Sequence, residues 1–515
     1  MKKYFLVLTA AMILFTYNNV YGQVSLKRSG NAIFLSVKNS PMLVLGGETG
    51  NSEATSVEDI RNLFGNSVLM NTVNTLFVPV MWDMTEPEEN HFDFSLIDET
   101  IKQARGKEKK IIFLWFGAWK NSMSCYAPAW VKKDTGRFPR AVDAAGNKME
   151  IVTVFSDNLL AADKKAFCKV LAHIHDVDNE ENTVIMMQIE NEIGMLGAAR
   201  DHCPLAEKAF AEWQKSGLGK KFAYKENLES DAQDELFQTY YYARYVEQMA
   251  VAGKKCHDIP MFVNTALDSR GRKPGDYPSA GPLAKLMHVW KKTAPHVDVI
   301  APDIYDKGFK SWLSQYHTAN NPFFTPETQF DASSGVKALY TFGEEKAVGY
   351  SVFSVEKISS DESLHSLTGS YMVLKQMSPL LLSSLGKKKS WGLLFDGNES
   401  GRTIADDNDM EIECSHYSSL SWGPNHNDKS KWQETGGLII KLAEDDYFIA
   451  GEGIVAKFKS KKNNTGILSV DEVTVSSDGS LNFVRRLNGD EDHQGRQAMI
   501  PCGKVRLLHV KLYHY

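Results

Sequence analysis

Short apolar runs rich in Val, Ile and Phe recur between about residues 43 and 356, and charged segments with helical spacing separate them. A buried parallel strand reads as a continuous apolar run, and its alternation with helices is typical of a parallel sheet with crossover helices. Eight runs fit this description, which is the number that a closed barrel needs. They are Leu43 to Gly47, Thr75 to Trp82, Lys110 to Phe116, Val184 to Ile189, Met261 to Thr265, Val297 to Pro302, Pro322 to Thr325 and Ala347 to Phe353. The pattern therefore predicts a (β/α)8 TIM barrel.

The pattern changes near residue 386. The helix-like segment Leu364 to Met377 is expected to close the barrel, and Gly386 to Ser390 is typical of a linker. Beyond it, short strands with period-two alternation, such as Gly437 to Leu442 and Val505 to Tyr513, indicate a β-sandwich. A chain of 515 residues is long enough for two domains. We therefore predict an α/β fold with a barrel at residues 23–385 and a smaller C-terminal sandwich at residues 386–515.

The first 22 residues have the features of a secretory signal peptide. Lys2 and Lys3 precede an apolar stretch from Tyr4 to Phe15, and the small residue Gly22 stands before Gln23. No later apolar run is long enough to span a bilayer. The sequence therefore predicts signal removal and a soluble, exported protein, periplasmic or extracellular, without an integral membrane segment.

Charge and cysteine content narrow the possible partners and cofactors. The net charge is -6 and the pI is about 6.2, and no run of Lys and Arg is interleaved with aromatic residues, so nucleic acid is not an expected partner. The six cysteines are widely spaced, and they form no Cys-x-x-Cys pair and have no histidine at metal-binding spacing. We expect no metal site, and the sequence sets neither a disulfide pairing nor the oligomeric state.

The strand from Val184 to Ile189 ends in two carboxylates, an amide and a glycine, Glu190 to Gly194. In barrels of this kind, the residues just past the C-terminal end of a strand face the active site. Hydrolysis of a glycosidic bond needs one protonated and one ionised carboxyl group. An apolar strand before Glu192 favours a raised pKa and the acid role. A structural ion pair is the alternative for this residue.

Glu327 is the best candidate for the second carboxylate, because the apolar run Pro322 to Thr325 ends beside it. It lies far from Glu192 in the sequence, and only barrel closure could bring both strand ends to one rim. Asp303 and Glu356 also stand near strand ends and are rivals for this role.

Asn191 and Glu192 are neighbours at a strand end, and their side chains are expected to point in opposite directions there. In a regular strand, Glu190 and Glu192 share one face and Asn191 points the other way. Asn191 and Glu192 can therefore reach the same sugar only if the strand end bends or bulges. Glu190 is then expected to be a structural acid.

Aromatic and amide residues at two other strand ends are candidates for substrate contacts. Trp82 could form a wall for the apolar face of a sugar, and Trp119 and Asn121 follow the third predicted strand. Aromatic faces with a few well-placed polar groups are typical of pockets for small polar ligands.

Several of these stretches resemble glycoside hydrolase family 35, the β-galactosidases of clan A. The run Gln188 to Gly194 is similar to the family signature Gln-x-Glu-Asn-Glu-Tyr-Gly. Trp82 to Pro87 with the later Phe92-Asp93-Phe94, and Pro128-Ala129-Trp130, resemble three further motifs of the family. The resemblance covers separate parts of the barrel, and the whole chain looks like the bacterial branch that carries one C-terminal β-domain.

The resemblance implies roles for the candidate residues. It implies a retaining mechanism with Glu192 as acid/base, Glu327 as nucleophile and Asn191 bonded to the 2-hydroxyl of the sugar, without a cofactor. Tyr305 matches a tyrosine that clan members place near the nucleophile. Two departures concern the substrate: Ala118-Trp119-Lys120 stands where much of the family has Ala-Glu-Trp, and the tyrosine expected before Trp82 is replaced.

The leading hypothesis is an exported, exo-acting β-galactosidase that removes terminal galactose from oligosaccharides, with fragments of a plant polysaccharide as the expected source. One alternative is another clan A glycosidase, of the β-glucosidase or arabinopyranosidase type. The other is a carbohydrate-binding protein that has lost catalysis, and the presence of both Glu192 and Glu327 argues against it.

Overall fold

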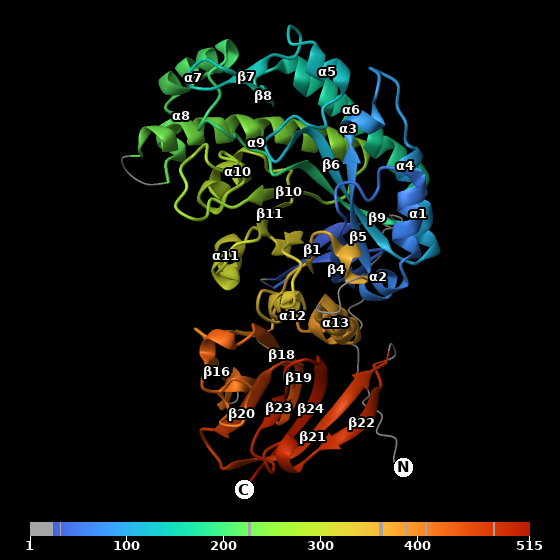
Figure 1. The fold of residues 1–515 in the computed structure, drawn as a ribbon, viewed down its shortest axis with the longest axis vertical. Helices are drawn as coiled ribbons and strands as arrows, with labels where there is room; N and C mark the ends of the chain where they lie inside the picture. The colour runs from blue at the N-terminus through green and yellow to red at the C-terminus, as the bar shows by residue number, and fades with distance from the viewer. Residues whose placement is uncertain are drawn as a thin grey trace.

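The computed structural model describes residues 24–30, 32–224, 228–359, 364–387, 389–406, 409–476 and 479–515. The expected signal peptide, residues 1–22, lies outside these residues. Figure 1 shows a barrel of strands and helices above a pair of antiparallel sheets, with α12 and α13 between them. No helix in the described part of the chain is long and apolar enough to cross a membrane.

The barrel contains all eight predicted strands, and their order around the sheet follows the chain. The strands are β4 (Val44–Glu48), β5 (Thr75–Met81), β6 (Lys110–Lys120), β9 (Val184–Asn191), β10 (Met261–Ala266), β11 (Val299–Ile304), β12 (Phe324–Thr325), β13 (Glu327–Thr328) and β14 (Gly349–Tyr350). Neighbouring strands are parallel wherever they pair. The predicted TIM barrel is confirmed.

The seventh strand closes the barrel in two parts. β12 pairs with β14 on one side, and β13 pairs with β11 on the other. Pro326 separates the two parts, and a proline has no N–H to donate to a sheet ladder. Because β12 and β13 form one extended stretch of chain, the sheet returns on itself, and Glu327 lies at the same rim as the ends of β9 and β11.

Helices cover the outside of the barrel between successive strands. They are α1 (Val57–Gly65), α2 (Ser67–Thr72), α3 (Trp82–Thr85), α4 (Ser95–Gly106), α5 (Ala129–Lys133), α6 (Asp157–Asp178), α7 (Pro204–Ser216), α8 (Leu218–Phe222), α9 (Ser230–Cys256), α10 (Met287–Thr293), α11 (Phe309–Tyr316), α12 (Ser334–Glu344) and α13 (His365–Ser383). The hairpin of β7 (Arg140–Val142) and β8 (Lys148–Val152) is inserted between β6 and α6.

A small antiparallel sheet precedes the barrel, and the sequence patterns did not predict it. It consists of β1 (Ser25–Ser29), β2 (Ala32–Val37) and β3 (Ser40–Met42). Its turn at Gly30 approaches Gly386, in the segment between α13 and the C-terminal sheets. The stretch that we assigned to the start of the barrel is therefore a separate hairpin that leads into β4.

The C-terminal region is a sandwich of two antiparallel sheets. One contains β15 (Ser390–Phe395), β18 (Thr435–Ala443), β19 (Asp446–Glu452), β24 (Arg506–His514), β21 (Thr465–Val475) and β22 (Leu481–Leu487) in that order. The other contains β16 (Gly401–Ala405), β17 (Met410–His416), β20 (Ile454–Ser460) and β23 (Ala498–Ile500). A shared apolar core fills the space between them. All six cysteines fall in the described residues, and none is bonded to another.

The six-stranded sheet is apolar on both faces. Along β18, Ile439 points into the sandwich core, whereas Leu438 and Ile440 belong to the core that continues into the barrel. Phe448 and Ile449 alternate in the same way on β19. The sheet is therefore the middle layer between the smaller sheet and the barrel helices, and its outer face would expose apolar side chains without them.

Replacement of Gly343 tests this packing. A Cβ atom there would lie 2.7 Å from Cβ of Leu438 and 3.0 Å from the carbonyl oxygen of Trp391, so α12 would have to move away from the sheet. We expect Gly343→Ala to cost about 1–3 kcal/mol and to lower the melting temperature by several degrees in a calorimetric scan. Gly106→Ala is the control, because nothing lies within 4 Å of a Cβ at that helix position. An equal effect of the two changes would contradict the close approach.

Candidate active site

The end of β9 bends, as the geometric condition from the sequence requires. Glu190 and Glu192 have φ angles of +57° and +44°, in the left-handed region that non-glycine residues seldom adopt. The pairing of β6 with β9 also shifts in register between Trp115 and Lys120. As a result, Asn191 and Glu192 both contact residues of the segment Lys120-Asn121. The two side chains therefore reach one site.

Glu192 is held by its backbone and its carboxylate. Its N–H donates to Oδ1 of Asn264 at 2.9 Å, and the side-chain amide of Asn121 donates to its carboxylate. Burial raises the pKa of Glu192 to about 7, the nearby charge of Glu327 adds to the rise, and Lys120 opposes it. The side chain is only 8% exposed. Such a group can hold a proton near neutral pH and release it during a reaction.

Glu327 lies at the same rim as Glu192, and strands β10 and β11 separate their two strands in the sheet. It is paired in register with Asp303 of the neighbouring strand β11, and the hydroxyl of Tyr305 donates to its carboxylate. Burial raises its pKa, while Lys120 and the Tyr305 hydrogen bond work in the opposite direction. Tyr305 is 41% exposed, so it can meet both Glu327 and a ligand.

Two further buried carboxyl groups face the pair. Asp303 accepts a hydrogen bond of 2.7 Å from the amide of Asn264, and Glu48 ends strand β4. Burial is the largest cause that raises the pKa of each, and the charge of Glu327 is the second. The four carboxyl groups therefore cannot all ionise together at neutral pH.

Asn264 links the two sides of the site. One amide group accepts from the N–H of Glu192 and donates to Asp303, which lies beside Glu327 in register. Asn264 is a polar residue inside β10, and Glu48 is the last residue of β4. Inspection of the first and fifth predicted strands, where no candidate was named, would have found both.

Of the two rivals for the second carboxylate, Glu356 lies elsewhere. Its carboxylate accepts from the backbone N–H of Gly50 at 3.1 Å and holds the loop after β4. Asp303 belongs to the site, but it is buried against Asn264 and does not replace Glu327 at the strand end.

Trp82 and Trp119 have packing positions instead of the predicted substrate contacts. Both side chains are completely buried. The indole N–H of Trp82 donates to Glu86 at 2.9 Å, and that of Trp119 donates to the carbonyl of Val152 at 3.1 Å. The positions of these residues at strand ends predicted that they lie at the rim. The sequence could not show that their rings turn outward and pack between the strands and the helices.

Glu190 forms a buried acid pair behind the site with Asp163 of α6. Its carboxylate accepts from the N–H of Trp119 at 2.8 Å, and Asp163 accepts from Trp115 and from the hydroxyl of Tyr245. Burial raises the pKa of both carboxyl groups, and Asp163 raises that of Glu190 further. This is the structural position expected for Glu190, because the pair joins the ends of β6 and β9 to the helix layer.

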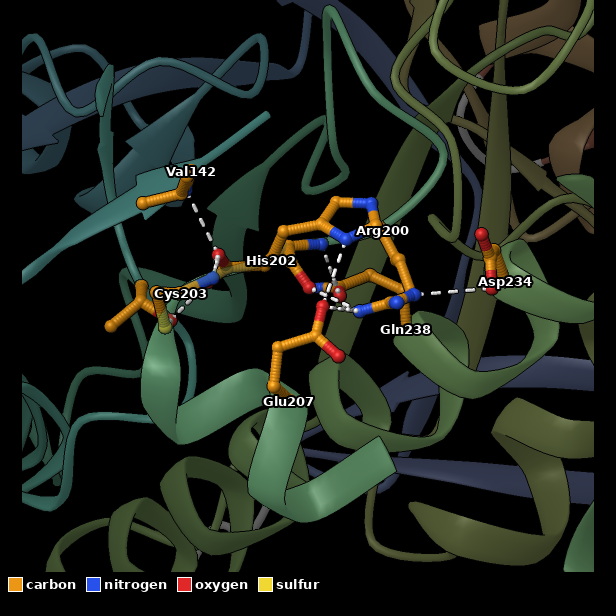
Figure 2. A network of polar contacts seen from close by, with 9 residues as sticks. Val142, Arg200, His202, Cys203, Glu207, Asp234 and Gln238 are labelled. Atoms are coloured by element: carbon orange, nitrogen blue, oxygen red, sulfur yellow. Dashed lines mark hydrogen bonds and ion pairs between the residues drawn. The ribbon is translucent and has the colours of Figure 1, made fainter. Parts of the chain in front are cut away.

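The segment after Glu192 is fixed by a charged network, which Figure 2 shows. Arg200 donates to Glu207 at 2.8 Å and to Asp234 at 3.1 Å, and His202 contacts the same oxygen of Glu207 at 2.9 Å. Asp201 accepts from the N–H groups of residues 142 and 203. The network connects the β7–β8 hairpin, α7 and α9, so the rim next to Glu192 is held on three sides.

Two family models match separate parts of the chain. A family model described as "Beta-galactosidase", that of glycoside hydrolase family 42, matches residues 53–231. Over this segment, which is less than half of the chain, the sequence is similar to that β-galactosidase family. The resemblance to family 35 is not supported at the level of the family, because the model that matches is that of family 42. A second model, described as a domain of unknown function (DUF5597), matches residues 367–499.

Solved structures show the fold. Gan42B, a GH42 β-galactosidase from G. stearothermophilus in its catalytic-mutant form, is 16% identical, with a TM-score of 0.50 over 66% of this chain and 57% of that one. The β-galactosidase of Rahnella sp. R3 has 14% identity and a TM-score of 0.49, with the same two shares. The chain thus covers less than two thirds of either protein. A search among curated proteins found no match.

Within the described residues, no group of three or more His, Cys, Asp or Glu side chains is placed to hold a metal ion. The site combines carboxyl groups with one lysine, three asparagine amides and a tyrosine hydroxyl. This set can donate a proton, carry a negative charge beside a developing positive one and bind hydroxyl groups.

The acid pair behind the site gives a pH-dependent prediction. The pKa of Glu190 is raised in the folded state, so protonated Glu190 contributes to the free energy of unfolding. This contribution is complete below the ordinary pKa of 4.5, and it is lost as the pH rises through the pKa of the folded state. Glu190→Gln cannot lose this proton and keeps an oxygen for Trp119. We expect the variant to melt with the wild type at pH 4 and a few degrees above it at pH 9. Glu413→Gln, on the exposed side of β17, is the control. A Glu190→Gln variant that melts below the wild type at pH 9 would refute the raised pKa of Glu190.

Proposed function

We propose that the protein is a retaining, exo-acting β-galactosidase that releases terminal galactose from oligosaccharides. One observation carries the proposal: two buried glutamates from distant parts of the chain, Glu192 and Glu327, stand at one barrel rim and interact electrostatically. The match to a β-galactosidase family model over the segment that contains Glu192 supports the glycon. The exo mode, and plant polysaccharide fragments as the source of substrate, rest on the sequence resemblance to clan A enzymes.

In this proposal, Glu192 is the acid/base. Its proton passes to the glycosidic oxygen as the bond to the anomeric carbon breaks, and Glu192 then takes a proton from the water that completes hydrolysis. A pKa of about 7 in a buried setting suits a group that must both give and receive a proton. Asn121 and the backbone contact to Asn264 fix its direction.

Glu327 is the nucleophile in the same scheme. It attacks the anomeric carbon as the leaving group departs, and water later releases the sugar from the covalent intermediate. Lys120 and the hydroxyl of Tyr305 lower its pKa against the effect of burial, so they favour the ionised form that attack requires. The protonated state favoured at Asp303 and Glu48 limits the negative charge around it.

The neighbouring polar groups are proposed to bind the glycon. We assign Asn191, Asn121 and Tyr305 to this role, because each contacts a member of the site. Export is also proposed, on the sequence of residues 1–22 alone, and the N-terminal sequence of the protein from its natural host would test it.

Glu327→Ala is expected to abolish turnover of aryl β-galactosides, because no carboxylate remains to form the glycosyl-enzyme. Added azide should restore activity and give a glycosyl azide of inverted configuration, identified by NMR. Glu356→Ala is the matched control, since that strand-end acid lies outside the site. A Glu327→Ala variant with wild-type turnover would show that the nucleophile was misassigned. Wild-type protein that binds oligosaccharides in a titration without releasing product would favour the carbohydrate-binding alternative.

Glu192→Gln is expected to reduce kcat/KM most for substrates with poor leaving groups, because these need the proton. The wild type should lose activity as the pH rises through about 7, the pKa of Glu192, and the variant should lack this alkaline limb. Rates for a series of aryl galactosides and glucosides between pH 5 and 9 test both points. Glucoside turnover equal to galactoside turnover would favour a different glycon, and an unchanged alkaline limb in the variant would exclude Glu192 as the acid.

A further inference from the structure

A cleft opens where the helices α12 and α13 meet the outer face of the six-stranded sheet, in the layer between the two domains that Figure 1 shows. One wall comes from the N-terminal parts of the two helices, and the other comes from β21, β22 and the start of β24. Its volume is about 860 Å3, within the range of roughly 300–1,000 Å3 that is usual for ligand sites. No residue of the carboxyl cluster lines it.

The cleft lies on the side of the barrel that carries the active site. In a barrel of this kind, each helix begins near the strand end at which the site lies. The lining residues of α13 fall between His365 and Gln376, and those at the start of α12 fall between Asp331 and Val336. Asp331 follows Glu327 by four residues, a stretch of chain that spans at most about 14 Å. The cleft therefore begins close to the segment that carries Glu327.

Apolar side chains stand on both walls of the cleft. Met372 of α13 and Val484 of β22 line it, and each is 52% exposed. The buried side chains of Val473 and Leu507 complete the apolar part of the lining. A ligand between the two walls would thus meet apolar surface on both of its faces.

Arg506, in the same lining, has a hydrogen-bond donor that the protein does not use. Its Nε is buried and has no hydrogen-bond partner among the described residues. Its contacts with Glu472 and Glu491 are ion pairs at 4.0 Å and 3.9 Å, and both involve another nitrogen of the guanidinium group. A buried donor in a folded protein is normally matched by an acceptor. Here, a ligand in the cleft can supply that acceptor.

The charges around the cleft are nearly balanced. Among the described lining residues, carboxylates outnumber cations by four to two. Lys337 and Arg485 lie outside the lining but form ion pairs with three of these carboxylates. Such a balance favours neither an anionic nor a cationic ligand. Carboxylate, amide and guanidinium groups beside apolar walls instead suit a neutral molecule with many hydroxyl groups and apolar ring faces, which is the chemistry of an oligosaccharide.

We propose that this cleft binds the aglycone chain of the substrate, a neutral β-linked oligosaccharide whose terminal galactose is removed at the rim that carries Glu192 and Glu327. The inference rests on the proposed function for the identity of the terminal sugar. It gives the C-terminal sandwich a part in substrate binding, because the sandwich supplies one wall. Binding energy gained far from the cleaved bond raises kcat/KM, so the enzyme prefers chains to short galactosides.

The test compares β-1,4-galactobiose with β-1,4-galactohexaose, which differ only in the length of the aglycone chain. Val484→Trp and Met372→Trp narrow the cleft from opposite walls, and Leu468→Trp is the matched control, at a 62% exposed position of β21 outside the lining. We expect each cleft variant to lower the ratio of kcat/KM for the hexaose to that for the biose by about tenfold, with galactobiose turnover unchanged. Leu468→Trp should keep the ratio of the wild type.

An unchanged ratio in both cleft variants overturns the proposal. An equal loss for both substrates also overturns it, because the cleft would then act through folding or through the catalytic rim. If Val484→Trp does not fold, Met372→Trp carries the test alone. A second copy of the chain is another conceivable occupant. It would give a dimer in sedimentation velocity that Val484→Trp dissociates, and that result would overturn the oligosaccharide site.

Calorimetric titration with galactohexaose separates this inference from the proposed function. Wild-type protein that cleaves neither substrate refutes the β-galactosidase, and the cleft is then judged by binding alone. Binding that Val484→Trp weakens about tenfold and Leu468→Trp leaves unchanged supports the cleft. No binding by the wild type, or binding that neither cleft variant changes, overturns it.

Discussion

Closure of the barrel at the seventh strand is the constraint on which the site depends. The segment around Pro326 pairs with β14 before the proline and with β11 after it, so a single stretch of chain joins the two edges of the sheet. Parallel strands all end at one rim once the sheet is closed. Glu48, Glu192 and Glu327, which are far apart in the sequence, become neighbours for this reason alone.

This arrangement has an electrostatic cost, and the surrounding groups reduce it. Carboxyl groups in a poorly solvated site resist ionisation, and each ionised one raises the pKa of the next. The protein opposes the effect with one cation, Lys120, and with hydrogen bonds from Asn121 and Tyr305. As a result, the carboxyl groups differ in how readily they ionise. The pKa values of Asp303 and Glu48 are raised well above their ordinary values, whereas the hydroxyl group of Tyr305 and the ammonium group of Lys120 favour the ionised form of Glu327. Acid and nucleophile chemistry requires this kind of difference.

The sequence predicted the barrel well, because continuous apolar strands and their spacing are local signals. It also predicted that Glu192 and Asn191 could meet only at a bent strand end, which two left-handed residues provide. It failed where the direction of a side chain depends on packing, as for Trp82 and Trp119, which are buried outside the ring of strands. It also missed Glu48 and Asn264, because one polar residue at the end of a strand gains meaning only when neighbouring strands are known. The hairpin β1–β3 was missed because its strands are short and partly exposed.

The C-terminal sandwich packs directly against two helices of the barrel, α12 and α13. Its six-stranded sheet buries one face against α12 and α13, and the apolar core is continuous across that boundary. Helix α12 follows directly from the strand that carries Glu327, and its Gly343 lies against Leu438 and Trp391 of the sheet. A displacement of the sheet would therefore act on the helix that supports the Glu327 strand. The burial of both faces of this sheet therefore connects a domain outside the barrel to the helix that follows the Glu327 strand.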